Sequence, residues 1–543
     1  ANRVAFLRGA RTHEGTLFRV RPTNLLGDVV NAGVTYLAGP GPALTGANFP
    51  GHTAYRNTNK TRPAVVYVGA NDGMLHAFSG VNGKELFGYI PGSVFNKLNG
   101  LSAFSFRHEY LVDGTPMVGD FERTGSTATA PSWGTILVGG LGAGGRGYYA
   151  LDITNQSNFA TSTEAALASS VPMWEFTSAD DVDLGFTFNE PSIHPGNGTY
   201  RQISKVADAT EATGVWRVIV GNGYGSIDAS NNPIGKAILF MLNANTGAVA
   251  TKLQAYAPTA ASPAQNGLSA PTPVDTDRDG LIDTVYAGDY LGNMHKFQFS
   301  KASGGDFVLA KSGEADGAWR YLGKVYASGE PITTAPSVIP ACSGIGWNVL
   351  FGTGKLNEAG DYTDNSARGF YNVLDRSPSS SLTVPATDLA TISSFTEPVL
   401  GDGFVGRNWS TPNLTGKRGW KISFSGGERV LTNSTLPPDT GAVLFGTTQP
   451  TGDICTPGNS GYLMAVNICS GATGDLIFNG VAVGGVAVDS SGVIKVSNTY
   501  TSQQNKQVVV CNQEHCKEVG GGGQFAPSIA PRGRYSWREL LSK

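Results

Sequence analysis

The feature that most constrains the fold is a short apolar pattern that recurs along the chain. Three apolar residues, mostly β-branched or aromatic, are followed by a glycine, a turn and a second apolar segment. This pattern is typical of antiparallel hairpins, and the glycine suits a strand end where a side chain would crowd a neighbouring unit. Six copies occur: Val66–Gly69, Ile136–Gly139, Val218–Gly221, Val285–Gly288, Val349–Gly352 and Val443–Gly446.

Two of these copies match beyond the triplet. VYVGANDGMLHAF (66–78) and VYAGDYLGNMHKF (285–297) share Val, Tyr, both glycines, His and Phe in register. The second glycine of each copy, Gly73 or Gly292, is predicted to supply the positive φ that a hairpin turn needs. His76 and His295 occupy equivalent positions, which favours packing within a repeated unit over metal ligation.

Repeated hairpins predict an all-β fold. The signature glycines follow one another at about 75 residues on average, more than the roughly 40–50 residues of a small propeller blade, so long insertions are expected. Stacking small antiparallel sheets around an axis covers both faces of each sheet. We therefore predict a β-propeller closed by pairing of the chain-terminal strands. Seven blades are favoured, with Gly492–Ser497 and Gln507–Val510 in the seventh, and six blades are the alternative.

The regions outside the repeat set the predicted domain limits. Residues 1–63 form an N-terminal lead-in and surface loop, because Pro40–Asn59 is rich in Gly, Pro, Thr and Asn. Residues 64–516 form the propeller. Residues 517–543 form a glycine-rich hinge and a basic, aromatic tail. We expect this tail to dock on a partner through Tyr535, Trp537, Arg538 and Leu540.

Composition excludes several functional classes. Charged residues make up 15% of the chain and the net charge is −3, so there is no basic field for nucleic acid. No apolar run of about 18 residues marks a membrane span. Gly142–Gly147 has the spacing of a dinucleotide-binding loop, but apolar strand-like segments flank it on both sides, so a hairpin loop is the better interpretation.

The sharpest chemical signal is DTDRDGLID, residues 275–283. Carboxylates stand at loop positions 1, 3, 5 and 9, glycine stands at position 6 for a sharp bend, and position 7 offers its carbonyl. Without a cation the carboxylates would repel one another, so one calcium ion is expected. Position 12 is Tyr286 and not Glu, and no flanking helices are evident, so the loop is expected between two strands. The predicted ligands are Asp275, Asp277, Asp279, Leu281 (backbone carbonyl) and Asp283.

The five cysteines contain no Cys-Xaa-Xaa-Cys pair. Cys455 and Cys469 flank a turn and strand, and Cys511 and Cys516 bracket a short loop. The sequence therefore predicts two short-loop disulfides, Cys455–Cys469 and Cys511–Cys516, with Cys342 as a buried thiol. The alternative is five reduced thiols in a cytosolic protein.

Several motifs, taken in order, carry a family resemblance. They are AFLRGARTHEGTLFRVRPTNLLGDVV (5–30), VYVGANDGMLHAF, GNGYGS (221–226), the acidic loop, FGTGK (351–355) and SWREL (536–540). Together they resemble the C-terminal domain of the PilY/PilC family of type IV pilus tip-associated adhesins, and the likeness spans nearly the whole chain.

This resemblance implies a modified, quinoprotein-like propeller that is secreted through the bacterial periplasm. It implies a place at the pilus tip, cell surface or outer membrane with minor pilins, and roles in pilus assembly, twitching motility and adhesion to host or abiotic surfaces through the full-length protein. It also implies that calcium at the acidic loop governs pilus extension against retraction.

Two other functions remain possible interpretations. Pyrroloquinoline-quinone dehydrogenases share the propeller and use calcium, but they characteristically carry two adjacent cysteines, and no two cysteines are adjacent here. We therefore predict that the chain is not an enzyme. An extracellular scaffold unrelated to pili would differ from the favoured interpretation only in its partner.

Overall fold

The computed structural model describes residues 1–521 apart from 43, 189, 194–199, 261–264, 301–316, 377–382, 402, 438–440, 451–458, 475, 479–480, 491–507 and 512–515. For residues 459, 476–478, 489–490, 508–511 and 516–521 it describes the backbone. The predicted tail residues Tyr535, Trp537, Arg538 and Leu540 lie outside the described residues, as do Gly492–Ser497 and Cys455.

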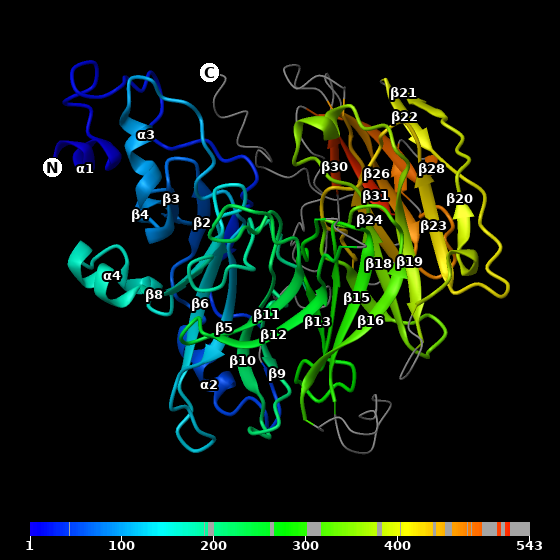
Figure 1. Ribbon diagram of the computed structural model, residues 1–543, viewed down its shortest axis with the longest axis horizontal. Helices are drawn as coiled ribbons and strands as arrows, with labels where there is room; N and C mark the ends of the chain where they lie inside the picture. The colour runs from blue at the N-terminus through cyan, green and yellow to red at the C-terminus, as the bar shows by residue number, and fades with distance from the viewer. Residues whose placement is uncertain are drawn as a thin grey trace.

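The described strands form seven sheets, as predicted for a seven-bladed propeller. Figure 1 shows the sheets following one another from the blue N-terminal sheet, through cyan and green, to orange and red. The first four each use four consecutive antiparallel strands. Sheet 1 holds β1 (Thr35–Leu37), β2 (Val65–Ala70), β3 (Met74–Ser79) and β4 (Glu85–Tyr89); sheet 2 holds β5 (Met117–Glu122), β6 (Trp133–Gly140), β7 (Gly147–Asp152) and β8 (Pro172–Thr177); sheet 3 holds β9 (Ile203–Val206), β10 (Val215–Gly221), β11 (Ala237–Asn243) and β12 (Val249–Tyr256); sheet 4 holds β13 (Thr272–Val274), β14 (Thr284–Gly288), β15 (Asn293–Phe299) and β16 (Trp319–Ala327).

The last three sheets do not consist of consecutive strands. Sheet 5 has the order β17-β18-β19-β23-β20. The strands of sheets 6 and 7 alternate in the sequence, because β29 pairs in sheet 6 although it lies between strands of sheet 7. Sheet 5 holds β17 (Ser337–Pro340), β18 (Trp347–Gly352), β19 (Arg368–Asp375), β20 (Ala390–Ile392) and β23 (Gly419–Phe424); sheet 6 holds β21 (Val399–Gly401), β22 (Phe404–Arg407), β24 (Ala442–Gly446), β25 (Gln449–Pro450), β26 (Asn459–Asn467) and β29 (Gly485–Ser490); sheet 7 holds β27 (Leu476–Phe478), β28 (Val481–Val483), β30 (Val508–Cys511) and β31 (Cys516–Gly521).

Two predictions about the chain ends disagree with the described strands. Among the described strands, β1 pairs only with β2, and both edges of sheet 7 are C-terminal strands, so no terminal strands pair across the ring. The predicted hinge also begins too early, because β31 continues through Gly521 and Gly520 pairs with Ile477. Strand pairing with β27 holds glycines that the sequence alone assigns to a linker.

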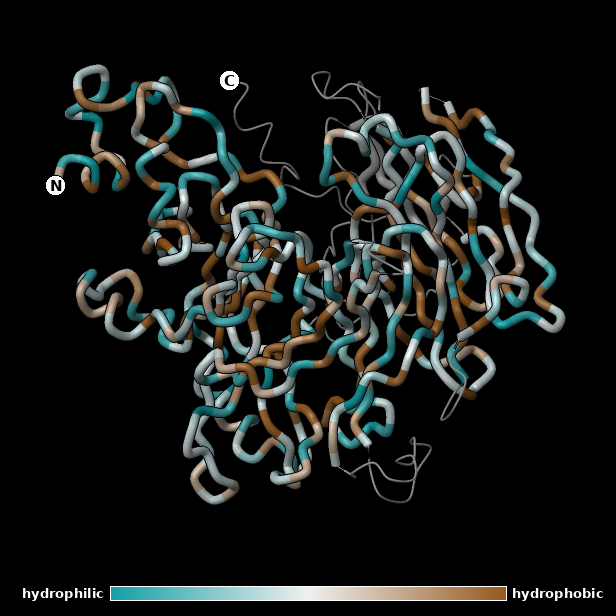
Figure 2. Tube along the Cα trace, in the orientation of Figure 1, coloured by the Kyte–Doolittle hydropathy of each residue, from teal (hydrophilic) through white to brown (hydrophobic). Residues whose placement is uncertain are grey.

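Successive side chains of a triplet pack alternately into the cores on the two faces of its sheet. In β10, Val218 and Val220 pack in the core shared with sheet 2, and Ile219 packs against sheet 4. The same alternation places Tyr286 of β14 toward sheet 5. Side chains of a strand point to opposite faces in turn, so each blade needs a neighbour on both sides. Figure 2 shows the hydrophobic segments following the strands, as this arrangement requires.

In β6 the predicted alignment is wrong by one residue. Leu137, the middle residue of its triplet, packs toward sheet 1, whereas the middle residue Ile219 of β10 packs toward the following sheet. A one-residue shift exchanges the two faces of a strand. The equivalent glycine is therefore Gly140, where an added Cβ would approach Thr187 O at 3.1 Å, and not Gly139, which abuts the ring of Tyr149 in its own sheet.

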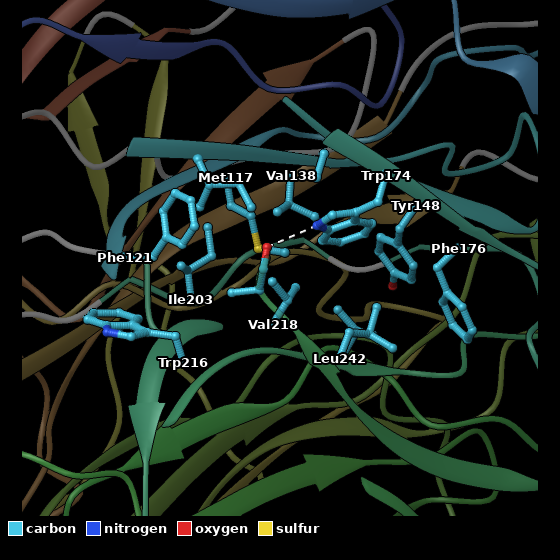
Figure 3. Packing of buried hydrophobic residues seen from close by; sticks show 14 of the residues in the cluster. Met117, Phe121, Val138, Tyr148, Trp174, Phe176, Ile203, Trp216, Val218 and Leu242 are labelled. Atoms are coloured by element: carbon cyan, nitrogen blue, oxygen red, sulfur yellow. Dashed lines mark hydrogen bonds between the residues drawn. The ribbon is translucent and has the colours of Figure 1, made fainter. Parts of the chain in front are cut away.

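The core between sheets 2 and 3 contains several large aromatic side chains. Figure 3 shows Phe121, Tyr148, Trp174, Phe176 and Trp216 around smaller aliphatic residues. Trp174 Nε1 donates a hydrogen bond to the carbonyl of Ala244 at 2.9 Å. Burial of such aromatic surface is a large stabilising contribution at an interface between blades.

Short helices decorate the sheets. They are α1 (Asn2–Leu7), α2 (His52–Asn59), α3 (Leu98–Ser102) and α4 (Glu164–Ser170), with 3₁₀ turns at Gly92–Lys97, Gln156–Asn158, Ala359–Tyr362 and Ala386–Asp388. The prediction of residues 1–63 as lead-in and surface loop is therefore incomplete. This region supplies strand β1 and helix α2, and Phe49 and His52 are buried.

Candidate metal centre

The acidic loop connects β13 to β14, so the prediction of a loop between two strands is confirmed. These strands pair antiparallel, with Val274 opposite Thr284. The next residue on each side is an aspartate, Asp275 or Asp283. Strand pairing therefore brings the first and last carboxylates of the nine-residue segment to the same end of the hairpin.

Three of the predicted carboxylates come together. Asp275, Asp277 and Asp283 each offer an oxygen, and these oxygens lie within 4.8 Å of one another. Asp279 is outside this group, and its Oδ1 accepts the backbone N–H of Leu281 at 2.8 Å. The described structure thus gathers three of the four side chains that the sequence assigned to one cation.

The loop backbone turns tightly around Asp275. The N–H groups of Arg278 and Gly280 donate to its two carboxylate oxygens at 2.6 and 2.8 Å. Gly280 has φ +91°, as expected for the sharp bend, and Arg278 has φ +65°. A non-glycine residue in the left-handed region costs energy, and such strain collects at functional sites.

Burial makes two of the carboxylates hard to ionise. It raises the pKa of Asp275 to about 6, with Asp279 and Asp277 adding to the increase and the N–H groups of Gly280 and Arg278 opposing it. Burial likewise raises the pKa of Asp283 to about 6, against hydrogen bonds from Thr276 and Thr284. A nearby divalent cation would favour the ionised forms, so the donor set fits a hard metal ion.

Sheet 3 holds the far half of the loop in place. Ile282 N donates to the carbonyl of Lys205, and Ala207 N donates to the carbonyl of Ile282, both at 2.9 Å. Leu281 is only 5% exposed and packs in a small cluster with Ala207 and Phe299. Ile282, through its backbone, and Leu281, through its side chain, thus hold the loop against sheet 3 and the core.

The predicted pairing of Cys469 with Cys455 is wrong, and so is the prediction of Cys342 as a buried thiol. Cys469 forms a disulfide with Cys342, with 5.7 Å between the Cα atoms and 127 residues between them in sequence. Cys342 follows β17 in sheet 5, whereas Cys469 follows β26 in sheet 6. Stacking of the two sheets brings these turns together, which proximity in sequence could not indicate.

The other predicted disulfide stays a prediction. Cys511 and Cys516 are directly opposite residues of the β30–β31 hairpin, and their side chains lie outside the described residues. Cys455 lies outside them as well.

His76 and His295, the two histidines at equivalent repeat positions, contact residues of their own sheets, as predicted for packing within a repeated unit. His295 Nε2 lies 2.8 Å from Asp289 Oδ2, and both side chains are fully buried. His76 lies 3.1 Å from Asp72 and 2.6 Å from Glu85. Gly142–Gly147 connects β6 to β7, so its interpretation as a hairpin loop is confirmed.

The fold and this loop define a β-propeller protein with a candidate cation site between two strands of one blade. The sequence model of the PilY1 beta-propeller domain matches residues 26–400. The chain belongs to this family.

Two relatives and one solved structure show the extent of the similarity. The chain is 31% identical to a type IV pilus biogenesis factor PilY1 homolog of Xylella fastidiosa, over all of this chain and 41% of the relative. It is 30% identical to type IV pilus biogenesis factor PilY1 of Pseudomonas aeruginosa strain PAK, over all of this chain and 47% of the relative. The crystal structure of the Pseudomonas aeruginosa PilY1 C-terminal domain matches with a TM-score of 0.64 and 26% identity, covering 89% of this chain and 99% of that domain.

The chain thus spans less than half the length of these curated relatives. Within the described part of the chain, no helix has both the length and the apolar character needed to cross a membrane.

Proposed function

We propose that this chain is a calcium-binding, non-enzymatic regulator of type IV pilus assembly. The observation that carries the proposal is the cluster of Asp275, Asp277 and Asp283 within a chain of the PilY1 propeller family. The relatives are named as pilus biogenesis factors, which supports a role in the same system.

The metal would be held by oxygen donors alone. The three gathered carboxylates supply most of the negative charge, and the carbonyl of Leu281 and the side chain of Asp279 complete the predicted set. Calcium accepts six to eight oxygens in flexible geometry, whereas magnesium demands a near-ideal octahedron. An irregular loop of this kind therefore suits calcium.

The loop residues act as a conformational switch in this proposal. Asp275 is half-buried and Asp283 is buried, and Asp277 lies beside both, so their ionised forms disfavour the closed loop. A bound cation neutralises the carboxylates and fixes the hairpin end of sheet 4. The surface presented by that end then differs between the two states, and we propose that the pilus machinery responds to the difference.

The family supports a proposal for the partners and the location. We propose that the full-length protein is secreted through the periplasm and acts with minor pilins at the pilus tip or outer membrane, in twitching motility and in adhesion. The Cys342–Cys469 disulfide supports an oxidising compartment. The carboxylate cluster serves structure and regulation in this scheme, so we propose that the chain is no dehydrogenase.

Calorimetric titration with calcium tests the binding step. The wild-type chain should bind one ion, and Asp277→Ala should lose most of the heat. Asp228→Ala is a matched control, because Asp228 also accepts backbone N–H bonds in a turn, from Ser230 and Asn232 at 2.8 Å, but lies outside the acidic loop. Equal heats for wild type and Asp277→Ala would contradict the assignment.

Motility assays test the regulatory step in the full-length protein in a piliated host. Asp277→Ala removes a ligand and leaves repulsion between the remaining carboxylates, so pili should be absent or unable to retract. Asp277→Lys supplies a positive charge in place of the ion and should keep surface pili. Normal twitching of both variants would reduce the loop to a structural element.

A further inference from the structure

The connection between β1 and β2 contacts the acidic loop of sheet 4. Asn48 Nδ2 donates a hydrogen bond to the backbone carbonyl of Asp279 at 2.8 Å. The ring of Phe49 lies against Gly280, where an added Cβ would come within 2.8 Å of Phe49 Cε2. Two consecutive residues of the N-terminal region thus contact two consecutive residues of the loop.

The same segment is also anchored to sheet 2. His52 is fully buried, with Nδ1 accepting the N–H of Leu44 at 2.9 Å and Nε2 lying 3.0 Å from Asp120 of β5. Trp133 of β6 donates from Nε1 to the carbonyl of Pro50 at 2.7 Å. We call residues 44–52 the clip. Sheet 2 fixes one end of the clip, and its middle rests on the acidic loop of sheet 4.

A buried lysine joins the clip to the strand that holds the loop. Lys205 Nζ donates to the carbonyl of Asn48 at 2.7 Å and pairs with Glu122 at 2.6 Å. The backbone carbonyl of the same lysine accepts the N–H of Ile282. Residue 205 therefore contacts both the clip and the loop, and movement of either would disturb its contacts.

The contact point lies within the candidate cation site. Asp279 and Gly280 stand between Asp277 and Asp283, two of the three carboxylates that come together. Gly280 also donates its N–H to Asp275. The backbone conformation that gathers the carboxylates is therefore the one that Asn48 and Phe49 support.

We propose that the clip stabilises the loop conformation that binds the cation, with Asn48 and Phe49 as positioning residues. In turn, cation binding stabilises the position of the clip against the loop. This inference rests on the calcium binding proposed above and adds the segment through which occupancy reaches the N-terminal region. Coupling between two binding equilibria is reciprocal, so a clip that stabilises the occupied loop must itself be stabilised by the cation.

Calorimetry with calcium chloride tests the first half of the coupling. Asn48→Ala removes one hydrogen bond to the loop and should weaken binding by about 3- to 10-fold. Asn59→Ala is the matched control, because Asn59 also donates to a backbone carbonyl, that of Tyr55 at 2.9 Å, but does not touch the loop. Asn59→Ala should bind as tightly as wild type, and Phe49→Leu should fall between wild type and Asn48→Ala.

Hydrogen exchange tests the second half and separates positioning from general stability. Calcium should slow amide exchange across residues 44–52 in wild type and in Asn59→Ala. Asn48→Ala should lose much of this calcium-dependent change. A residue with a purely structural role would instead alter exchange equally with and without calcium.

The outcomes distinguish this inference from the proposed function. If wild type binds calcium but Asn48→Ala binds equally well, or if exchange of the clip is unchanged by calcium, the coupling is overturned and calcium binding stands. If wild type shows no heat with calcium, both the proposed function and the coupling are overturned.

Discussion

Sheets 1 and 4 share one hairpin sequence but differ in the connection that precedes it. β2–β3 and β14–β15 follow the same pattern, with Gly73 at φ +92° and Gly292 at φ +82°. In sheet 4 the first two strands are joined by the short acidic loop, whereas in sheet 1 they are joined by residues 38–64 with helix α2.

The histidines of the two hairpins show how far the equivalence extends. His76 pairs with Asp72, and His295 pairs with Asp289, which aligns with Ala70 and not with Asp72. Each hairpin therefore pairs its buried histidine with an aspartate, but the aspartate stands at a different position of the hairpin. The repeat preserves the strand geometry, and the connection before it is free to diverge into a candidate ion site or a clip.

The largest expected effect concerns the shared glycines at the ends of β2 and β14. A Cβ at Gly69 would lie 2.5 Å from the backbone oxygen of Val112, whereas a Cβ at Gly288 would lie 2.2 Å from a side-chain atom of Ile332. Gly69→Ala should cost about 3–5 kcal/mol, because backbone cannot move aside. Gly288→Ala should cost less, and it should cost less again in the Ile332→Ala background, which lacks the Cγ2 atom that the new Cβ would meet.

Chemical denaturation measures both variants, with Gly100→Ala as a control at a helical position that has open space around it. Gly100→Ala should be neutral or slightly stabilising. Similar losses for Gly69→Ala and Gly288→Ala, without recovery by the second substitution, would contradict the proposed difference between the two sheets.

The second prediction concerns calcium, which is expected to bind at sheet 4 and not at sheet 1. At a free calcium concentration 100 times the dissociation constant, binding should stabilise the native chain by about 3 kcal/mol. Thermal unfolding with calcium and with EDTA measures this difference. Asp277→Ala should lose most of it, and retention of the full stabilisation in that variant would place the ion elsewhere.

The third prediction concerns pH in the absence of calcium. The pKa of Asp283 is raised from 3.8 to about 6, so between these values the folded chain holds protons that the unfolded chain releases. Stability should therefore fall as pH rises from about 4 to 6, by roughly 1–2 kcal/mol. The difference in unfolding free energy between wild type and Asp283→Asn isolates this effect, which calcium should abolish. A difference that does not vary with pH in EDTA would contradict it.

The smallest expected effect lies in sheet 1. His76 is buried, which lowers its pKa, but Asp72 and Glu85 outweigh burial and raise it from 6.5 to about 9. The stabilisation from this charged histidine is complete below pH 6.5 and is lost as pH rises through 9. It should amount to about 1 kcal/mol. His76→Gln should remove the pH dependence in this window, and a wild-type curve parallel to the variant would show that the pairs contribute nothing.

The repeat could be interpreted without a structure because its signals are local. Strand alternation and turn glycines act over a few residues, so Tyr67 or Gly292 can be assigned from its neighbours alone. The acidic loop is equally local, and pairing of β13 with β14 is enough to bring Asp275 and Asp283 together. The departure of Asp279 from the gathered carboxylates reflects a backbone hydrogen bond that spacing does not specify.

Other features depend on which sheets become neighbours. Cys469 pairs with Cys342 because sheets 5 and 6 stack, and Phe49 is buried because a loop rich in glycine and proline lies against sheets 2, 3 and 4. The one-residue shift in β6 likewise depends on which face meets sheet 1. The sequence by itself determined the strands, their turns and the order of the acidic residues, since these rest on short-range sterics and charge. Only the tertiary structure decided the disulfide, the clip and the faces of β6, because these contacts join segments whose proximity arises from packing of whole sheets.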